Sequence, residues 1–166
     1  MKVNKLKQLV QSLEELLDSP ESVGRFDMAH FGAIYELITP LPNSIKPVCN
    51  TAACLAGQTV LVFGTGVLND DGGIDIIQKL ELPSGWDDSR NNQILAQATK
   101  DLGLTANQRD RLFFFKGWYN VGTEETVYTG WPEQFRSQHD KAKTQQGRIL
   151  AAIRRVEHFI KTQGRE

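Results

Sequence analysis

Two cysteines and one histidine are the residues of this chain whose types most readily support chemistry. Cys49 and Cys54 are the only two cysteines, in the segment CNTAACLAGQ, and His30 comes before them on an expected helix. If Thr51 caps a helix that begins at Ala52, Cys54 is its third residue and the two sulfurs lie near each other. A helix N-terminus favours thiolate, so this geometry suits a redox pair or a metal-bound pair.

Several interpretations of this pair stay open. A structural zinc ion needs four ligands, and C-x4-C is looser than the usual C-x2-C spacing. The other histidines, His139 and His158, do not stand at a spacing that completes a site. A labile disulfide, a reactive thiol and a Cys–His catalytic pair with His30 are further alternatives. Two buried thiols are the simplest reading, because free cysteine is among the most buried residue types.

The element expected to position the cysteines is an apolar helix from Ala52 to about Phe63. Because it is apolar nearly all round, it should be central and buried, with the N- and C-terminal helices packed around it. Before it, Asp27 can cap a helix over Met28–Ile38, and three prolines then enforce an extended connector.

Composition indicates one soluble domain over residues 1–166. The chain is 40% hydrophobic and 23% charged, with a formal net charge of −1. That balance argues against nucleic acid and against an anionic membrane surface as partner. The sequence shows no transmembrane run and no signal peptide, and two cysteines without an export signal favour a reducing cytoplasm. We expect a mainly α, single-domain helical bundle.

The two ends of the chain are expected to be amphipathic helices. The first has a stripe of apolar residues at three–four spacing and ends at Asp18–Pro20. Its two heptads could pair with another chain, as an alternative to packing on the core of its own chain. Its lysines come early and its acids late, against the helix dipole. The C-terminal helix has a stripe of Ile149, Ile153, Val156 and Ile160, widened by Leu150 and Phe159.

A sharp helical corner is expected between residues 91 and 115. Asn91–Leu102 has one apolar face, Gly103 is a left-handed stop, and Thr105 with Gln108 forms a capping box for a helix that runs to about Phe115. The pair of helices over 94–115 could be a DNA-reading helix-turn-helix. Against that, its second helix opens with ANQRDR, which has no large apolar residue to pack on the first helix.

The segments around this corner carry weaker patterns. Thr59–Asp70 resembles the start of a dinucleotide-binding fold, yet turn formers follow its glycines where a helix should begin. Ile74–Leu82 is ambiguous between strand and helix. Tyr119–Tyr128 could be a small hairpin, so we expect at most a small β element in one of these two places.

Aromatic residues gather in the same part of the sequence. Trp118, Tyr119, Tyr128 and Trp131 are candidates for a partner-binding surface, since tryptophan and tyrosine anchor protein interfaces. The alternative is a satellite core under a long loop. A short helix is expected after Pro132.

Four motifs, taken together, resemble small uncharacterised proteins of bacteriophages and bacteria. They are FDMAHF at Phe26–Phe31, CNTAACLAG at Cys49–Gly57, DLGLTANQRDRLF at Asp101–Phe113 and AIRRVEHFI at Ala152–Ile160. This chain has Asn50 where the pattern has glycine. The resemblance implies a compact helical fold, a phage accessory role and a structural pairing of Cys49 with Cys54. It implies no activity and supplies no catalytic residue.

The function expected from these observations is that of a non-enzymatic accessory or regulatory protein that binds another protein, with no cofactor. One alternative is a thiol- or metal-dependent enzyme centred on Cys49, Cys54 and His30. The other is DNA binding through residues 94–115. The oligomeric state is left open.

Overall fold

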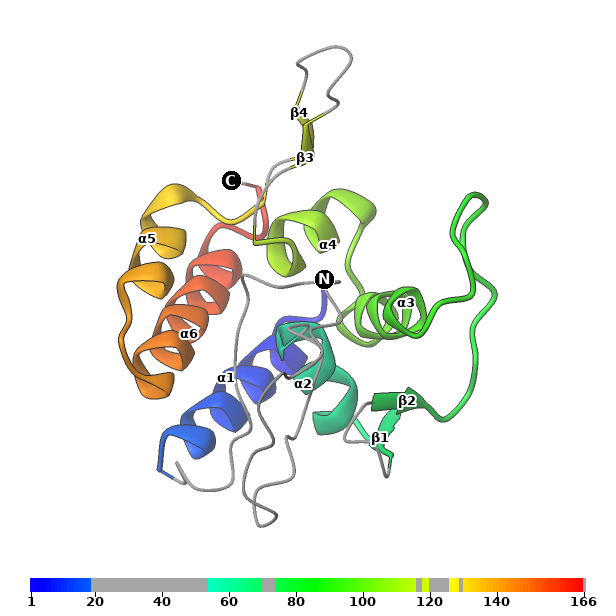
Figure 1. Cartoon of the computed structure of the whole chain (residues 1–166), viewed down its shortest axis with the longest axis horizontal. Helices are drawn as coiled ribbons and strands as arrows, with labels where there is room; N and C mark the ends of the chain where they lie inside the picture. Colours follow the sequence, from blue (N-terminus) through cyan, green and yellow to red (C-terminus); the bar gives the residue numbers. More distant parts are fainter. Residues whose placement is uncertain (19–53, 70–73, 116–117, 120–125, 129, 166) are drawn as a thin grey trace, which may run out of the picture.

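The structure, a computed structural model, describes residues 1–18, 54–69, 74–115, 118–119, 126–128 and 130–165. These residues form six helices and two small antiparallel hairpins (Figure 1). The elements, in chain order, are α1 (Val3–Asp18), α2 (Cys54–Val62), β1 (Gly66–Leu68), β2 (Ile74–Ile76), α3 (Arg90–Leu102), α4 (Ala106–Phe113), β3 (Trp118–Tyr119), β4 (Thr126–Tyr128), α5 (Glu133–Lys141) and α6 (Gln145–Lys161). The mainly helical fold is confirmed, and both suggested places for a β element carry a hairpin.

The helical corner is as the sequence predicts. Ser89 caps α3 by accepting a hydrogen bond from the Asn92 N–H, and Gly103 ends the helix with φ of 62°. Thr105 and Gln108 form the expected capping box of α4, in which both reciprocal hydrogen bonds are present. The left-handed glycine turns the chain sharply, so α4 leaves α3 at once.

The terminal helices form one side of the molecule. α6 packs between α1 and α5, and the three helices lie together in Figure 1. α2 packs mainly against α3, with α1 as a further neighbour. The prediction that both terminal helices surround α2 is therefore only half right. The apolar stripe of α1, with Leu6, Leu9 and Leu13 fully buried, fills the place next to α6.

The predicted stripe of α6 needs one correction. Ile149, Ile153 and Val156 are buried and Phe159 is 0% exposed, but Leu150 is 40% exposed. Leu150 follows Ile149 by one residue, which is about 100° around the helix, and this places it outside the buried face. Thr144 caps the N-terminus of α6, and its side chain accepts a hydrogen bond from the Gly147 N–H.

Trp131 belongs to the core, so its prediction as a surface residue is wrong. Its side chain is 2% exposed and its indole N–H donates to the Leu112 carbonyl at 2.7 Å. The ring packs on Phe115 at 5.4 Å and on the buried His139 at 6.3 Å. The alternative interpretation, a satellite core, is correct for this residue. A buried indole N–H needs a hydrogen-bond acceptor, and the Leu112 carbonyl supplies it.

Within the described ranges, no helix is both long and apolar enough to cross a bilayer.

We predict that Trp131→Ala lowers the free energy of unfolding by about 3–5 kcal/mol, as for other large-to-small core substitutions. The substitution removes a buried ring and leaves the Leu112 carbonyl without its donor. Urea unfolding followed by circular dichroism measures the change. Lys143→Ala, at an exposed position, is the control and should cost less than about 0.5 kcal/mol. A Trp131→Ala variant as stable as this control would place the ring at the surface after all.

Candidate functional site

The β1–β2 hairpin is anchored at its base by a close approach to α2. The chain leaves α2 through Gly64, in the left-handed region at φ of 63°, and the Thr65 N–H donates to the Val60 carbonyl at 2.9 Å. A Cβ at Gly66 would lie 2.8 Å from Val60 Cγ2 and 3.1 Å from Ile74 Cγ2. Only glycine therefore lets β1 lie this near α2.

The opposite side of the hairpin is open to solvent. Val67 pairs with Asp75, and the Ile77 N–H donates to the Thr65 carbonyl at 3.1 Å, which extends the ladder by one pair. Alternation along the strand buries Ile74 and turns Asp75 and Ile77 outward. We call Val67, Asp75 and Ile77 the hairpin face.

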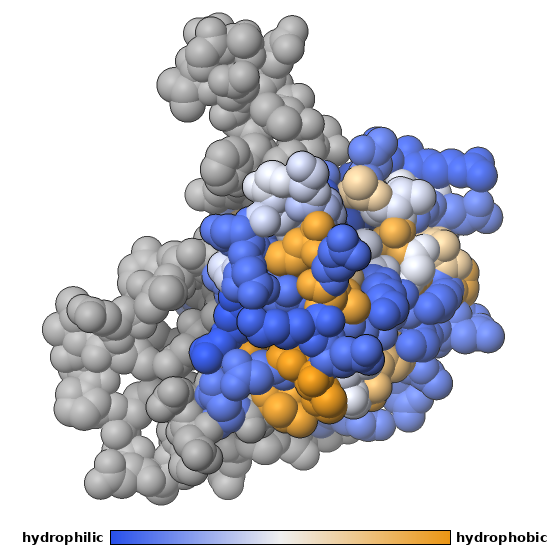
Figure 2. All heavy atoms as spheres, turned by 90° about the vertical axis from the view of Figure 1, so that its right-hand side faces the viewer, coloured by the Kyte–Doolittle hydropathy of each residue, from blue (hydrophilic) through white to orange (hydrophobic). Residues whose placement is uncertain are grey.

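The hairpin face carries two of the most exposed large hydrophobic side chains of the described residues. Val67 is 48% exposed and Ile77 is 63% exposed. The two positions are diagonal neighbours on the ladder, close enough for their side chains to form one apolar patch. Figure 2 views the molecule from the right-hand side of Figure 1, where β1 and β2 lie, and shows hydrophobic surface lying among hydrophilic side chains.

Asp75 is held in place between the two apolar residues. Arg90 Nε lies 3.0 Å from Asp75 Oδ1, and Asn69 Nδ2 donates to Asp75 Oδ2 at 3.1 Å. Both members of the ion pair are about half exposed, so the pair contributes little to stability. Its effect is to fix the orientation of the carboxylate and to link the hairpin to the start of α3.

Behind the hairpin, α3 presents three polar side chains at spacing i, i+4 and i+8. Gln93, Gln97 and Asp101 are 4%, 6% and 7% exposed, and we call them the polar ridge. Gln97 Nε2 donates to Asp101 Oδ1 at 3.1 Å, and Thr65 Oγ1 donates to Asp101 Oδ2 at 2.7 Å. The ridge therefore fastens the base of the hairpin to α3.

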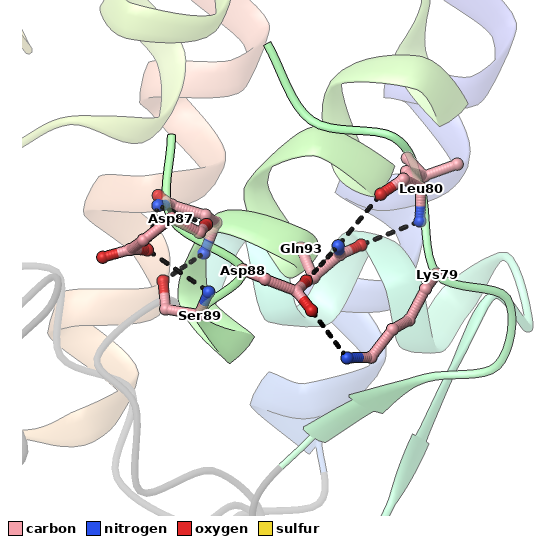
Figure 3. A network of polar contacts seen from close by, with 7 residues as sticks. Lys79, Leu80, Asp87, Asp88, Ser89 and Gln93 are labelled. Atoms are coloured by element: carbon pink, nitrogen blue, oxygen red, sulfur yellow. Dashed lines mark hydrogen bonds and ion pairs between the residues drawn. The ribbon is translucent and has the colours of Figure 1, made fainter. Parts of the chain in front are cut away.

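The same ridge holds the loop over 77–89, and Figure 3 shows the contacts. Gln93 accepts a hydrogen bond from the Leu80 N–H at 2.9 Å and donates to the Leu80 carbonyl at 3.0 Å. It also donates to Asp88 Oδ1 at 2.7 Å, and Lys79 Nζ donates to Asp88 Oδ2 at 2.9 Å. The side chain of Gln93 thus holds the loop at two points, Leu80 and Asp88.

The far end of the loop is fixed by the cap of α3. Asp87 Oδ1 accepts from the Ser89 N–H at 3.2 Å and from Asn92 Nδ2 at 2.7 Å. Hydrogen bonds from the Ser89 side chain and backbone, and then from Asn92, lower the pKa of Asp87. Hydrogen bonds from Lys79 and Gln93, with the Lys79 charge, lower the pKa of Asp88.

Trp86, near the end of the loop, reaches α4. The Arg109 guanidinium lies 4.8 Å from the centre of the Trp86 ring and is also paired with Asp110 at 2.6 Å. Arg111 Nη1 donates to the Gly164 carbonyl at 3.0 Å. Both arginines of α4 therefore bind other parts of this chain, which favours a structural corner over a DNA-reading motif in residues 94–115.

The residues predicted to do chemistry are only partly placed. Cys49 and His30 lie outside the described residues, and Cys54 is the first residue of α2 without a described side chain. In the part of the chain that the structure describes, no group of three or more His, Cys, Asp or Glu could hold a metal ion. The thiol and metal interpretations of Cys49, Cys54 and His30 stay predictions.

The predicted aromatic surface is placed by its backbone alone. Trp118 and Tyr119 form β3, Tyr128 belongs to β4, and Trp118 pairs with Tyr128 across the hairpin. β4 lies against α4, and Figure 1 shows the hairpin at the edge of the helical body. The side chains of these three residues lie outside the described part.

Sequence reasoning missed the polar ridge and the hairpin face. The four-residue spacing of Gln93, Gln97 and Asp101 beside a known apolar stripe could have indicated the ridge. The alternation Ile74–Asp75–Ile76 could have indicated a half-buried strand. Exposure of Ile77 has no such indication, since an isoleucine in a sequence is more often buried.

Comparison with known proteins brings no relative. No protein-family model, no curated protein and no solved structure matches the chain.

We predict that Gln93→Leu loosens the loop over 77–89 without unfolding the helices. The substitution keeps most of the volume and removes three hydrogen bonds, each worth about 0.5–1.5 kcal/mol. Hydrogen exchange at the Leu80 N–H should become at least about tenfold faster. Gln146→Leu, exposed on α6, is the control. Unchanged exchange at Leu80 would show that Gln93 does not clamp the loop.

Acid should release the same clamp. Because the folded pKa of Asp87 and of Asp88 lies below the ordinary value of 3.8, their contribution is present above that pH. It is lost as the pH falls through the lower folded values. Exchange at Leu80, referred to its intrinsic rate, should therefore be steady from neutral pH to about 4 and rise below it. Asp88→Asn should shift this transition, and an unmoved transition would contradict the assignment.

Proposed function

We propose that this protein is a non-enzymatic accessory or regulatory protein that binds another protein through its hairpin face. The observation that carries the proposal is the exposure of Val67 and Ile77, at 48% and 63%, at diagonal positions on one side of a short hairpin. An exposed apolar pair with a polar surround is typical of protein contact sites.

The support beneath this face makes it suitable for recognition. Gly66 holds β1 on α2, and Asp101 and Gln93 bind the base of the hairpin and the following loop. A surface held from below loses little conformational freedom when a partner binds, so more of the contact energy remains as affinity.

The β3–β4 hairpin is the second contact that we propose. Trp118, Tyr119 and Tyr128 are of the types that anchor interfaces, and the ladder sets Trp118 opposite Tyr128. The resemblance of four motifs to small phage and bacterial proteins is the reason to propose a phage-derived regulator.

We predict that Ile77→Asp and Val67→Asp each abolish capture of the partner. A carboxylate in the centre of an apolar contact must be desolvated on binding, which costs well over 1 kcal/mol. Tagged protein is used as bait in lysate of the source cells, and captured proteins are quantified by mass spectrometry. Leu150→Asp, at another exposed apolar position on α6, is the matched control and should capture the same partner as wild type.

Capture of the same proteins by all four baits would contradict the hairpin face as the contact. Trp118→Ala with Tyr128→Ala then tests the second contact by the same measurement. Stoichiometric zinc or one fast-reacting thiol in the folded protein would favour the enzyme centred on Cys49, Cys54 and His30. DNA binding with a steep salt dependence would favour the helix-turn-helix.

A further inference from the structure

The groove between α1 and α6 is a second surface that the proposed function does not use. It has a volume of about 240 Å³ and is lined by Lys7, Val10, Gln11, Glu14, Glu157 and Ile160. Val10 and Ile160 are partly buried hydrophobic residues that pack on the core, and they form its apolar floor. The charged side chains stand on its rim.

Charge is divided along this groove. On α1, Lys7 lies toward the N-terminus and Glu14 lies two turns later, about 10 Å along the axis. Lys7 is the basic residue of the lining, and Glu14 and Glu157 are its acidic residues, so the groove carries charges of both signs. Within the described ranges, Lys7, Glu14 and Glu157 take part in no ion pair.

The edge of α1 beside the groove also has the spacing of a helix seam. Val3, Val10 and Leu17 recur every seven residues, with Val3 37% exposed and the other two partly buried. Lys7 and Glu14 follow Val3 and Val10 at the same offset of four, which places them beside the seam. The inward positions Leu6 and Leu13 are fully buried in the chain's own core. Because successive residues are about 100° apart around the helix, Val10 lies about 40–60° from Leu6 and Leu13, at the edge of the same buried stripe.

A second copy of this chain complements that arrangement. In an antiparallel pair of α1 helices, a two-fold axis passes between Val10 and Gln11. Lys7 of each copy then lies opposite Glu14 of the other, and Val10 of each copy lies opposite Gln11 of the other, next to the axis. A closed two-fold contact needs such self-complementarity, because the same patch must bind itself. We propose that the chain forms a homodimer through the α1–α6 groove, independently of the hairpin face.

Charge reversal tests the dimer directly. Lys7→Glu or Glu14→Lys alone turns both symmetric attractions into repulsions, and either should weaken dimerisation by about tenfold or more. The two variants mixed together should dimerise as well as wild type, because each attraction is restored between the two different chains. The double variant Lys7→Glu with Glu14→Lys should also dimerise. Sedimentation equilibrium over a range of protein and salt concentrations measures this.

The controls are Lys143→Glu and Glu81→Lys, which reverse exposed charges outside the groove and should leave dimerisation unchanged. Salt should weaken the wild-type dimer, because its charge pairs lie at the surface. A wild-type chain that stays monomeric at every soluble concentration would overturn the proposal. A dimer that the single variants leave intact, or that their mixture does not restore, would overturn it equally.

Discussion

The hydrogen bonding of the polar ridge on α3 is the constraint on which the candidate surface depends. A buried polar group without a partner costs about 1–3 kcal/mol, so Gln93, Gln97 and Asp101 must all be satisfied. α3 cannot satisfy them alone, since only Gln97 and Asp101 bond to each other. The Thr65 hydroxyl donates a hydrogen bond to Asp101. The Leu80 backbone and Asp88 supply the hydrogen-bond partners of Gln93. The hairpin and the loop therefore lie where the ridge needs them, and the outward position of Val67 and Ile77 follows.

Among the helices, a buried charged side chain, that of Arg155, is accommodated by a hydrogen bond and by aromatic rings. Arg155 is 0% exposed, and its Nη2 donates to the Arg111 carbonyl at 2.8 Å. Its guanidinium lies 5.8 Å from the Phe135 ring centre and 5.4 Å from that of Phe159, at distances where aromatic faces attract a cation. With Trp131 bonded to Leu112, these contacts join α4, α5 and α6. The edge of α1 that lines the groove, with Lys7 and Glu14, takes no part in these contacts.

Much of the helical framework could be predicted because its determinants are local. Gly103 and the Thr105–Gln108 capping box act within one or two turns, so residue type and spacing are enough. The stripes of α1 and α6 were recognisable for the same reason. The predictions for Leu150 and Trp131 were wrong because they concern the burial of a side chain and not the local backbone structure. Whether one edge of a stripe or one aromatic ring is covered depends on which neighbour packs there.

The candidate site was predictable only in part. An accessory role and a protein partner were inferred from what the sequence lacks, and the aromatic residues of β3 and β4 remain candidates. Nothing in the order of residues indicated that Thr65 would reach Asp101, 36 positions away, or that Gln93 would clamp Leu80. Such pairs form when distant segments pack, and each has many equivalent polar alternatives along the chain.

By itself, the amino-acid sequence determined where the helices at the corner begin and end, which faces of α1 and α6 are apolar, and that charge is divided along α1. These properties follow from hydrogen bonds and side-chain spacing within a few residues. Only the tertiary structure decided that the ridge of α3 is buried, that Trp131 is internal, and that Val67 and Ile77 are exposed on the same side of the hairpin. Burial is set by the packing of segments far apart in the chain, and no short stretch of sequence contains that information.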